Sequence, residues 1–186
     1  MKLRTIFCLV YFFIIMLFNS TINYAQNGWI NFKADAVLSF EIQVPAEMGV
    51  KTKEITTDLG PMTTATYAHE GKDEDANFLY VVNIVEYPSG TFPLDSLALK
   101  NEFLDESIES ILIGVDGELV YKSDIADGEN GLGRLFRVKY EEGHGIIKGK
   151  VFVKDDVFMT LQVYTTKEKS LNDEMDDFLS SFKVKF

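Results

Sequence analysis

The segment that most constrains the fold of this chain is residues 78–87, which are apolar on both faces of a would-be strand. In an extended segment, successive side chains point to opposite faces. One face would carry Phe78, Tyr80, Val82 and Ile84, and the other Leu79, Val81, Val85 and Tyr87. Strands of this kind belong to sheets that are covered on both sides. The segment therefore predicts a central sheet with a layer above it and a layer below it.

Two stretches with helical periodicity are candidates for those layers. In residues 94–113 the apolar positions are Leu97, Leu104, Ile108, Ile111 and Leu112, and the polar side carries Glu102, Asp105, Glu106 and Glu109. A second apolar stripe consists of Leu171, Met175, Phe178, Leu179 and Phe182. Such stripes are typical of helices that pack on a core with one face. Ser170 with Asp173 resembles a capping box at the start of the second helix.

Most of the remaining chain alternates with a period of two residues, as strands do. The predicted strands are residues 38–44, 51–59, 62–69, 118–123, 135–140, 146–153 and 157–164. Gly60-Pro61 predicts a turn, and Asp155-Asp156 predicts a tight hairpin. Strands, helix, strands and helix in this order predict an α+β fold, a three-layer α/β/α sandwich with a central antiparallel sheet.

The first 25 residues have the layout of a secretory signal peptide. A basic start at Lys2 and Arg4 precedes an apolar run from Ile6 to Phe18, and a polar stretch then leads to Ala25. The run is shorter than the roughly 20 residues that span a bilayer as a helix. We expect residues 1–25 to be removed and residues 26–186 to form a single domain, periplasmic or extracellular, without a transmembrane segment.

Charge and cysteine content narrow the partners and the means of stabilisation. The sequence has 18 Lys and Arg against 29 Asp and Glu, and its one cysteine is Cys8, inside the predicted signal peptide. An acidic chain repels nucleic-acid backbones and anionic lipid headgroups. We therefore expect no nucleic-acid partner, and a disulfide-free domain that depends on an ordinary core.

The second half of the chain resembles a known superfamily. Gly131-Leu132-Gly133-Arg134 precedes a strand, residues 149–153 and 157–163 form a hairpin, and residues 178–183 read Phe-Leu-Ser-Ser-Phe-Lys. This succession resembles the Mog1/PsbP-like superfamily and exported bacterial proteins similar to it. The resemblance implies a central antiparallel sheet between helices, and a binding or assembly factor rather than an enzyme. It carries no catalytic residues over to this chain.

Candidate metal sites are weak in this sequence. His69 and His144 both lie next to predicted turns, whereas a zinc site takes three or four His, Cys or carboxylate ligands. Acidic loops at Asp73–Asp75 and Asp124–Asn130 lack the ligand spacing of an EF-hand, and the sequence leaves open whether they bind a cation. We predict no metal and no cofactor.

Motifs for catalysis are equally weak. The sequence has no Gly-x-Ser-x-Gly elbow, and Ser180 and Ser181 lie late on a predicted helix. No catalytic residue is predicted.

Two function classes follow. The first is an exported non-enzymatic binding or accessory protein of the bacterial cell envelope, whose partner is a protein or a small ligand. The alternative is a hydrolase whose site is assembled from scattered carboxylates and His69 or His144. A deep pocket holding either histidine beside carboxylates would favour the hydrolase, and a groove-like apolar patch would favour the binding protein. The identity of the partner and the oligomeric state stay open.

Overall fold

The computed structural model describes residues 28–93, 95–126 and 128–185. The predicted signal peptide, its cleavage position and Cys8 lie outside these described residues.

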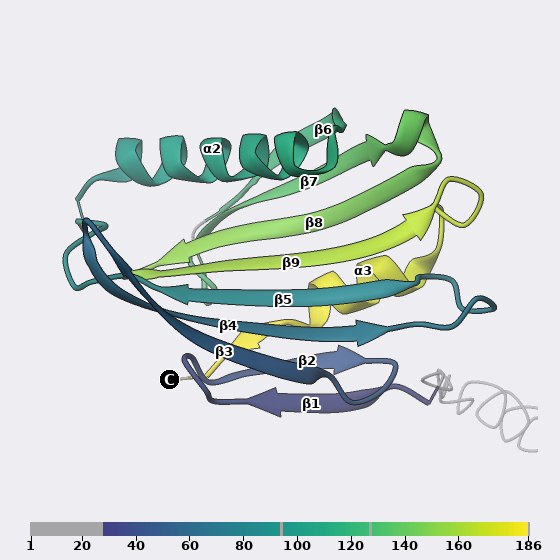
Figure 1. Ribbon diagram of the computed structural model, residues 1–186, viewed down its shortest axis with the longest axis horizontal. Helices are drawn as coiled ribbons and strands as arrows, with labels where there is room; N and C mark the ends of the chain where they lie inside the picture. Colours follow the sequence, from purple (N-terminus) through teal and green to yellow (C-terminus); the bar gives the residue numbers. More distant parts are fainter. Residues whose placement is uncertain (1–27, 94, 127, 186) are drawn as a thin grey trace, which may run out of the picture.

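The centre of the fold is a seven-stranded antiparallel sheet (Figure 1). Its strand order is β3-β4-β5-β9-β8-β7-β6, and the strands are β3 (Gly49–Thr57), β4 (Gly60–Glu70), β5 (Leu79–Glu86), β9 (Val157–Thr166), β8 (Gly145–Lys154), β7 (Leu132–Tyr140) and β6 (Glu118–Ile125). Lys154 pairs with Val157, so Asp155-Asp156 form the predicted two-residue hairpin. The α+β class with an antiparallel sheet is confirmed.

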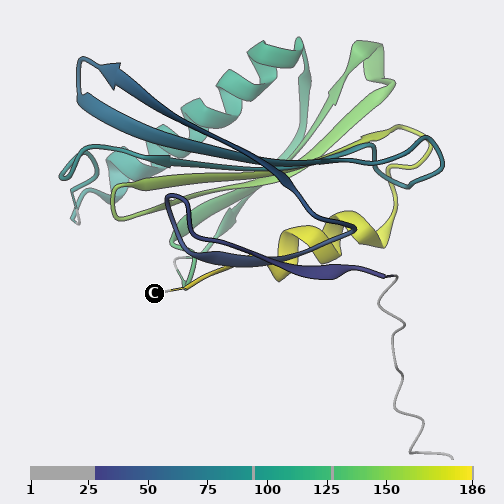
Figure 2. The same cartoon turned by 60° about the horizontal axis from the view of Figure 1, so that its bottom comes forward.

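A second, smaller layer lies under this sheet (Figure 2). It combines a three-stranded sheet of order β1-β2-β10 with helix α3 (Asp173–Ser181). The strands are β1 (Ile30–Ala34), β2 (Phe40–Val44) and β10 (Lys183–Val184). The predicted α/β/α sandwich is therefore met only in part, because strands share the lower layer with the helix.

The larger core lies between these two layers. Buried side chains of β2, α3 and the lower face of β5 and β9 meet there, among them Phe40, Ile42, Tyr80, Ile84, Leu161, Met175 and Phe178. The alternation of a strand explains which residues of β5 are buried in this core, because every second side chain of β5 points down into it. The Phe-rich end of the chain thus packs on the sheet as predicted.

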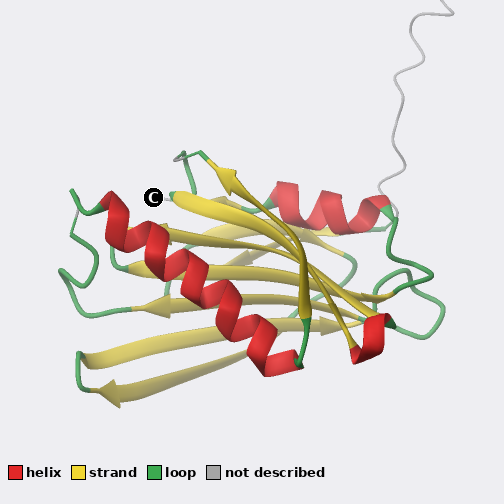
Figure 3. Cartoon of the chain, turned by 90° about the horizontal axis from the view of Figure 1, so that it is seen from above, coloured by secondary structure: helices red, strands yellow, loops and turns green. Residues whose placement is uncertain are grey.

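Helix α2 (Leu97–Val115) covers part of the upper face (Figure 3). Leu104 and Ile108 are buried against Phe136 and Ile147 of β7 and β8. Among the described residues, the helix reaches β7 and β8 and leaves the upper face of β3 and β4 without a helix over it. Neither α2 nor α3 has the length and apolar character that a membrane-spanning helix needs.

The two-sided covering predicted for residues 78–87 holds for one face only. Tyr80, Val82 and Ile84 are buried below, whereas Leu79 and Val85 on the other face are half-buried. The pattern correctly marked both faces as apolar, but α2 lies too far across the sheet to seal the upper one. An incompletely covered apolar surface of this kind often marks a binding site.

The predicted boundaries of the second helix need correction. Leu171 is 94% exposed and precedes α3, so it does not belong to the apolar stripe. The cap is Asn172, whose Oδ1 accepts a hydrogen bond from the Met175 amide at 3.1 Å. The Ser170 hydroxyl donates instead to the Lys167 carbonyl, so the predicted capping box is wrong.

The first predicted helix needs two smaller corrections. Leu97 is exposed at the start of α2. Asp105 was predicted on the polar side, yet its carboxylate lies 3.3 Å from the buried Arg134 guanidinium and also pairs with Lys122. These ion pairs, together with a hydrogen bond from Arg134 to Asn101 Oδ1, attach α2 to β6 and β7 at the edge of the sheet.

Candidate functional site

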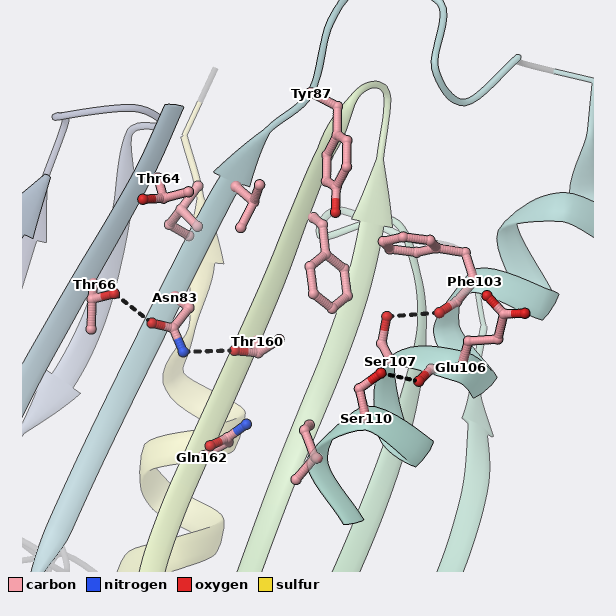
Figure 4. Close-up of a pocket in the computed structure, with 14 residues that line it drawn as sticks. Thr64, Thr66, Asn83, Tyr87, Phe103, Glu106, Ser107, Ser110, Thr160 and Gln162 are labelled. Carbon is pink, nitrogen blue, oxygen red and sulfur yellow. Dashed lines mark hydrogen bonds between the residues drawn. The ribbon is translucent and has the colours of Figure 1, made fainter. Parts of the chain in front are cut away.

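A groove of about 620 Å³ lies between α2 and the upper face of β4, β5 and β9 (Figure 4). Its size falls in the range of small-molecule sites, roughly 300–1,000 Å³. The floor is formed by side chains of three strands and the wall by one face of α2. The incomplete cover of the sheet by α2 is what creates this space.

A row of polar side chains crosses the floor. Thr66, Asn83 and Thr160 lie opposite one another on β4, β5 and β9. The Thr66 hydroxyl donates to Asn83 Oδ1 at 2.7 Å, and Asn83 Nδ2 donates to the Thr160 hydroxyl oxygen at 3.2 Å. These bonds (dashed in Figure 4) fix the amide of Asn83 in one orientation across the groove.

Two polar side chains of β9 that line the groove are buried. Thr160 is 6% exposed and Gln162 is 7% exposed. Gln162 Oε1 accepts a hydrogen bond from the Tyr164 hydroxyl at 2.6 Å, while its amide nitrogen has no hydrogen bond within the described residues. This nitrogen is not among the sealed, unsatisfied groups of the described residues, so solvent reaches it and it can donate to water or to a ligand.

Aromatic rings close one end of the groove. The Phe103 ring centroid lies 5.7 Å from that of Tyr87, 4.8 Å from that of Phe92 and 5.0 Å from that of Phe158. These are edge-to-face contacts, the favourable arrangement for aromatic pairs. The cluster provides a rigid apolar surface beside the polar row.

The Tyr87 hydroxyl is a further donor in the groove. Its ring belongs to the aromatic cluster and its oxygen points into the groove (Figure 4). Within the described residues this hydroxyl makes no hydrogen bond, and it is not one of the sealed, unsatisfied groups, of which Tyr67 is the sole case there. Burial raises the pKa of Tyr87, so the phenol is neutral at physiological pH and can donate.

The wall of the groove is helical and nearly uncharged. The Ser107 and Ser110 hydroxyls donate to the carbonyls of Phe103 and Glu106 on the preceding turn, which leaves their oxygens free to accept. Among the described residues that line the groove, Glu106 is the only Asp, Glu, Lys, Arg or His. The chain as a whole is acidic, so a groove with a single carboxylate among its described lining residues differs in charge from the rest of the protein.

A second cavity, of about 350 Å³, contains His69. Its lining includes Trp29, Tyr80 and the carboxylates of Glu70, Asp75 and Glu174. As predicted, His69 lies at the end of a strand next to a turn, and it is half-buried in β4. Its imidazole makes no hydrogen bond within the described residues and stacks loosely near Tyr80, with ring centroids 6.1 Å apart.

The polar bonds of this cavity hold the fold together. The Tyr80 hydroxyl donates to Glu174 Oε2 at 3.0 Å and accepts from Asn77 Nδ2 at 2.9 Å. Asn77 Nδ2 also donates to Asn172, the cap of α3. Burial raises the pKa of Tyr80. The network ties α3 to the turn before β5, and Ser, Thr and Cys are absent from the described lining of this cavity.

The other predicted candidates lie apart from His69 and make hydrogen bonds within the fold. His144 is exposed, and its amide donates to the Glu141 carbonyl after the short helix η1 (Glu141–Gly143). The Ser181 hydroxyl accepts from the Gln43 amide and donates to the Phe178 carbonyl. Ser180 is exposed and donates to Asp177. The structure does not bring these residues together with His69 in one cavity.

The acidic loops bind internal groups. The ammonium of Lys169 donates to the carbonyls of Asp73 and Asp75 at 2.8 and 2.6 Å. Asn130 joins the second loop to the end of the chain, through the Phe182 carbonyl and the Val184 amide. In the part of the chain that the structure describes, no three His, Cys, Asp or Glu side chains are grouped to hold a metal ion.

Comparison with known proteins gives low-identity matches among solved structures. No family model matches the sequence, and no curated protein matches it. The solved structures it resembles include cyanobacterial PsbP (CyanoP) from Synechocystis, with 14% identity, 73% of this chain and 92% of that chain covered, and a TM-score of 0.41. A Pseudomonas aeruginosa protein of unknown function is similar at 9% identity, over 80% of this chain and 90% of that chain, with a TM-score of 0.41.

The first of these structures bears the PsbP name of the superfamily that the sequence resembles. Neither likeness bears on function, because identities this low and TM-scores below 0.5 are compatible with different sites.

The groove residues were missed in the sequence, although a signal was present. Along residues 157–164, Thr160 and Gln162 alternate with Met159, Leu161 and Val163. This alternation is typical of an ordinary strand with one face exposed to solvent. Only the burial of both polar residues, which depends on α2 and the neighbouring strands, distinguishes a binding floor from a solvent-facing one.

Proposed function

We propose that the protein is a non-enzymatic binding protein of the bacterial cell envelope, and that it holds its ligand in the groove between α2 and strands β4, β5 and β9. The burial of Thr160 and Gln162 at the floor of an open groove carries this proposal. A largely apolar cavity with a few fixed polar groups is the usual form of a ligand site.

The chemistry of the lining favours binding over catalysis. Proton transfer at neutral pH requires a positioned group with a suitable pKa, whereas the groove offers hydroxyls, amides and a neutral phenol. Glu106 is exposed on the rim. These groups orient and hold a ligand but supply no acid–base pair.

The envelope location depends on the signal-peptide pattern of residues 1–25. An exported domain that holds a ligand without transforming it fits an accessory role, such as presenting or retaining a molecule outside the cytoplasm.

Backbone-amide NMR tests the position of the site. The isotopically labelled protein, as recovered from its host, is titrated with a small-molecule extract of the host envelope. We expect shifts at the amides around Tyr87, Thr160 and Gln162. Gln162→Leu should abolish them, while Gln43→Leu on β2 serves as the matched control. Shifts confined to residues around His69 and Tyr80 would place the site elsewhere.

The hydrolase alternative retains one specific observation, the cavity that holds His69 beside Glu70, Asp75 and Glu174. Turnover of envelope polymers, measured as release of reducing ends or free amines, tests it. We expect no turnover above the blank. Turnover that disappears in His69→Gln but persists in His144→Gln would establish the hydrolase instead.

A further inference from the structure

The residues that line the groove restrict the chemical class of its ligand. The first restriction is the kind of contact that the groove allows. The backbone groups of β4, β5 and β9 are engaged in ladders with neighbours on both sides. An extended peptide that binds by strand addition needs an unpaired edge, and this groove lies on a sheet face. Its occupant must therefore be bound through side chains.

The floor excludes a purely apolar occupant. A fatty acyl chain or the apolar face of a helix would cover the Gln162 amide nitrogen and the Tyr87 hydroxyl, which have no hydrogen bond within the described residues, without offering them a partner. Removing such groups from water without a partner costs free energy. The occupant must itself carry donors and acceptors along the side that faces β5 and β9.

The donors and acceptors on the floor are suited to hydroxyl groups. An amide presents both a donor and an acceptor, and a hydroxyl can act as either. Asn83 and Gln162 supply amides, while Thr160 and Tyr87 supply hydroxyls. Next to them, the rings of Phe103 and Phe158 offer apolar surface to the C–H face of a ring.

Charge restricts the ligand further. In the described part of the chain, Glu106 is the one carboxylate of the lining, and Asp, Lys, Arg and His are absent from that lining. The chain as a whole has a formal net charge of −11, so an anionic ligand would be repelled at long range as well as at the rim.

We infer that the groove binds a neutral sugar, with Tyr87, Thr160 and Gln162 bonding its hydroxyls and the Phe103–Phe158 pair contacting its C–H face. This inference rests on the proposed function and names the ligand class for the same site. A pyranose ring combines hydroxyls around its edge with apolar C–H faces, which matches the two halves of the groove.

Calorimetric titration with defined probes tests the inference. The probes are cellotriose, maltotriose and N,N′,N″-triacetylchitotriose, with trigalacturonate as the anionic counterpart and decanoate as the apolar one. We expect at least one neutral trisaccharide to bind, and trigalacturonate and decanoate not to bind.

Two variants connect the binding to the groove. Tyr87→Phe removes a hydroxyl that has no partner within the described residues, so the fold should be unaffected while the affinity falls about three- to tenfold. Gln162→Met should weaken binding by a similar factor. Tyr121→Phe on the exposed surface of β6 and Gln43→Met on β2 are the matched controls, and neither should change the affinity.

The possible outcomes separate the two proposals. Binding of trigalacturonate or decanoate without any neutral trisaccharide overturns the sugar inference and leaves a ligand-binding groove. Sugar binding that Tyr87→Phe and Gln162→Met do not weaken also overturns it, because the sugar then lies elsewhere. If neither these probes nor the envelope extract disturbs the groove amides, the proposed function fails with it.

Discussion

At the scale of single residues, Phe178 and Phe182 hold the lower layer against the main sheet. Phe178 is 0% exposed and Phe182 is 2% exposed. The Phe178 ring lies 5.2 Å from the Tyr80 ring of β5, and the Phe182 ring lies 5.3 Å from the Phe40 ring of β2. The two side chains thus connect the end of the chain to both sheets.

Truncating either ring should destabilise the protein strongly. A buried Phe replaced by Ala typically costs about 3–5 kcal/mol, out of the roughly 5–15 kcal/mol that holds a domain together. Phe178→Ala and Phe182→Ala should therefore lower the melting temperature by several degrees or more, as followed by circular dichroism. Leu171→Ala, at a 94% exposed position, is the control and should melt like wild type. Two Phe variants melting within about a degree of wild type would contradict this packing.

Leu171 also shows where a sequence pattern stops being informative. Its spacing from Met175 continues the apolar stripe, yet Asn172 has extended backbone angles, φ −120° and ψ 146°. The periodicity of apolar residues does not predict where the helix begins. The hydrogen bonds of Asn172 with the Met175 amide and with Asn77 fix that position. Phe178 and Phe182 were predicted correctly because they lie inside the helical stretch or directly after it.

At the scale of elements, the β8–β9 hairpin holds the loop that closes the aromatic end of the groove. The Asp156 carboxylate accepts hydrogen bonds from the amides of Phe92 at 2.9 Å and Gly90 at 2.8 Å. Phe92 is buried in the aromatic cluster. The hairpin residue thereby fixes the position of a ring that packs against Phe103 of the groove lining.

This attachment should depend on pH. The amide of Phe92, and then those of Gly90 and Thr91, hold the pKa of Asp156 below its ordinary value. A carboxyl whose pKa is lowered by folding stabilises the protein above its unfolded pKa of about 4, and this stability is lost as the pH falls through the lower, folded value.

Asp156→Asn retains an acceptor oxygen but no longer titrates. Thermal unfolding between pH 7 and pH 3 should therefore show a shallower acid loss of stability for Asp156→Asn than for wild type. Glu54→Gln, an exposed position on β3, is the matched control and should keep the wild-type slope. An unchanged slope in Asp156→Asn would mean that these bonds do not contribute.

Prediction from sequence succeeded for elements whose signal lies within a few neighbouring residues. It failed where the position of a residue depends on an element that is distant in the sequence. The Asp155-Asp156 hairpin was predicted because turn residues and flanking alternation lie within a few positions of each other. The covering of β5 was not predictable, since apolar character at Leu79 and Val85 does not specify what lies above them. The lower layer was misjudged for the same reason, because the pairing of β2 with β10 joins residues far apart in the sequence.

At the scale of the whole molecule, removal of the basic, apolar start of the sequence would make the remaining chain more acidic. The basic residues Lys2 and Arg4 lie in the predicted signal peptide, so its removal would leave a chain with 16 Lys and Arg against 29 Asp and Glu. Like charge keeps such a domain dispersed in solution. It also makes contact with anionic membrane surfaces unfavourable.

The signal-peptide pattern of residues 1–25 predicts that the processed protein begins near Gln26. N-terminal sequencing of the protein recovered from its native host tests this, and we expect it in the periplasmic or extracellular fraction. Replacing Ala25 by a bulky residue, as in Ala25→Trp, should slow processing, since small residues are required at the cleavage site. Intact Met1 recovered with the inner membrane would contradict the prediction.

The position of Trp29 has a consequence for spectroscopy. It is the only tryptophan of the sequence, and its ring contacts Tyr80 edge-on at 5.8 Å, on the face of the sheet opposite the groove. Its fluorescence is therefore an intrinsic reporter of one boundary, the docking of the N-terminal strands under the main sheet. Occupancy of the groove would leave the indole emission nearly unchanged and alter the tyrosine signal instead, so two wavelengths distinguish loosening of the lower layer from filling of the upper one.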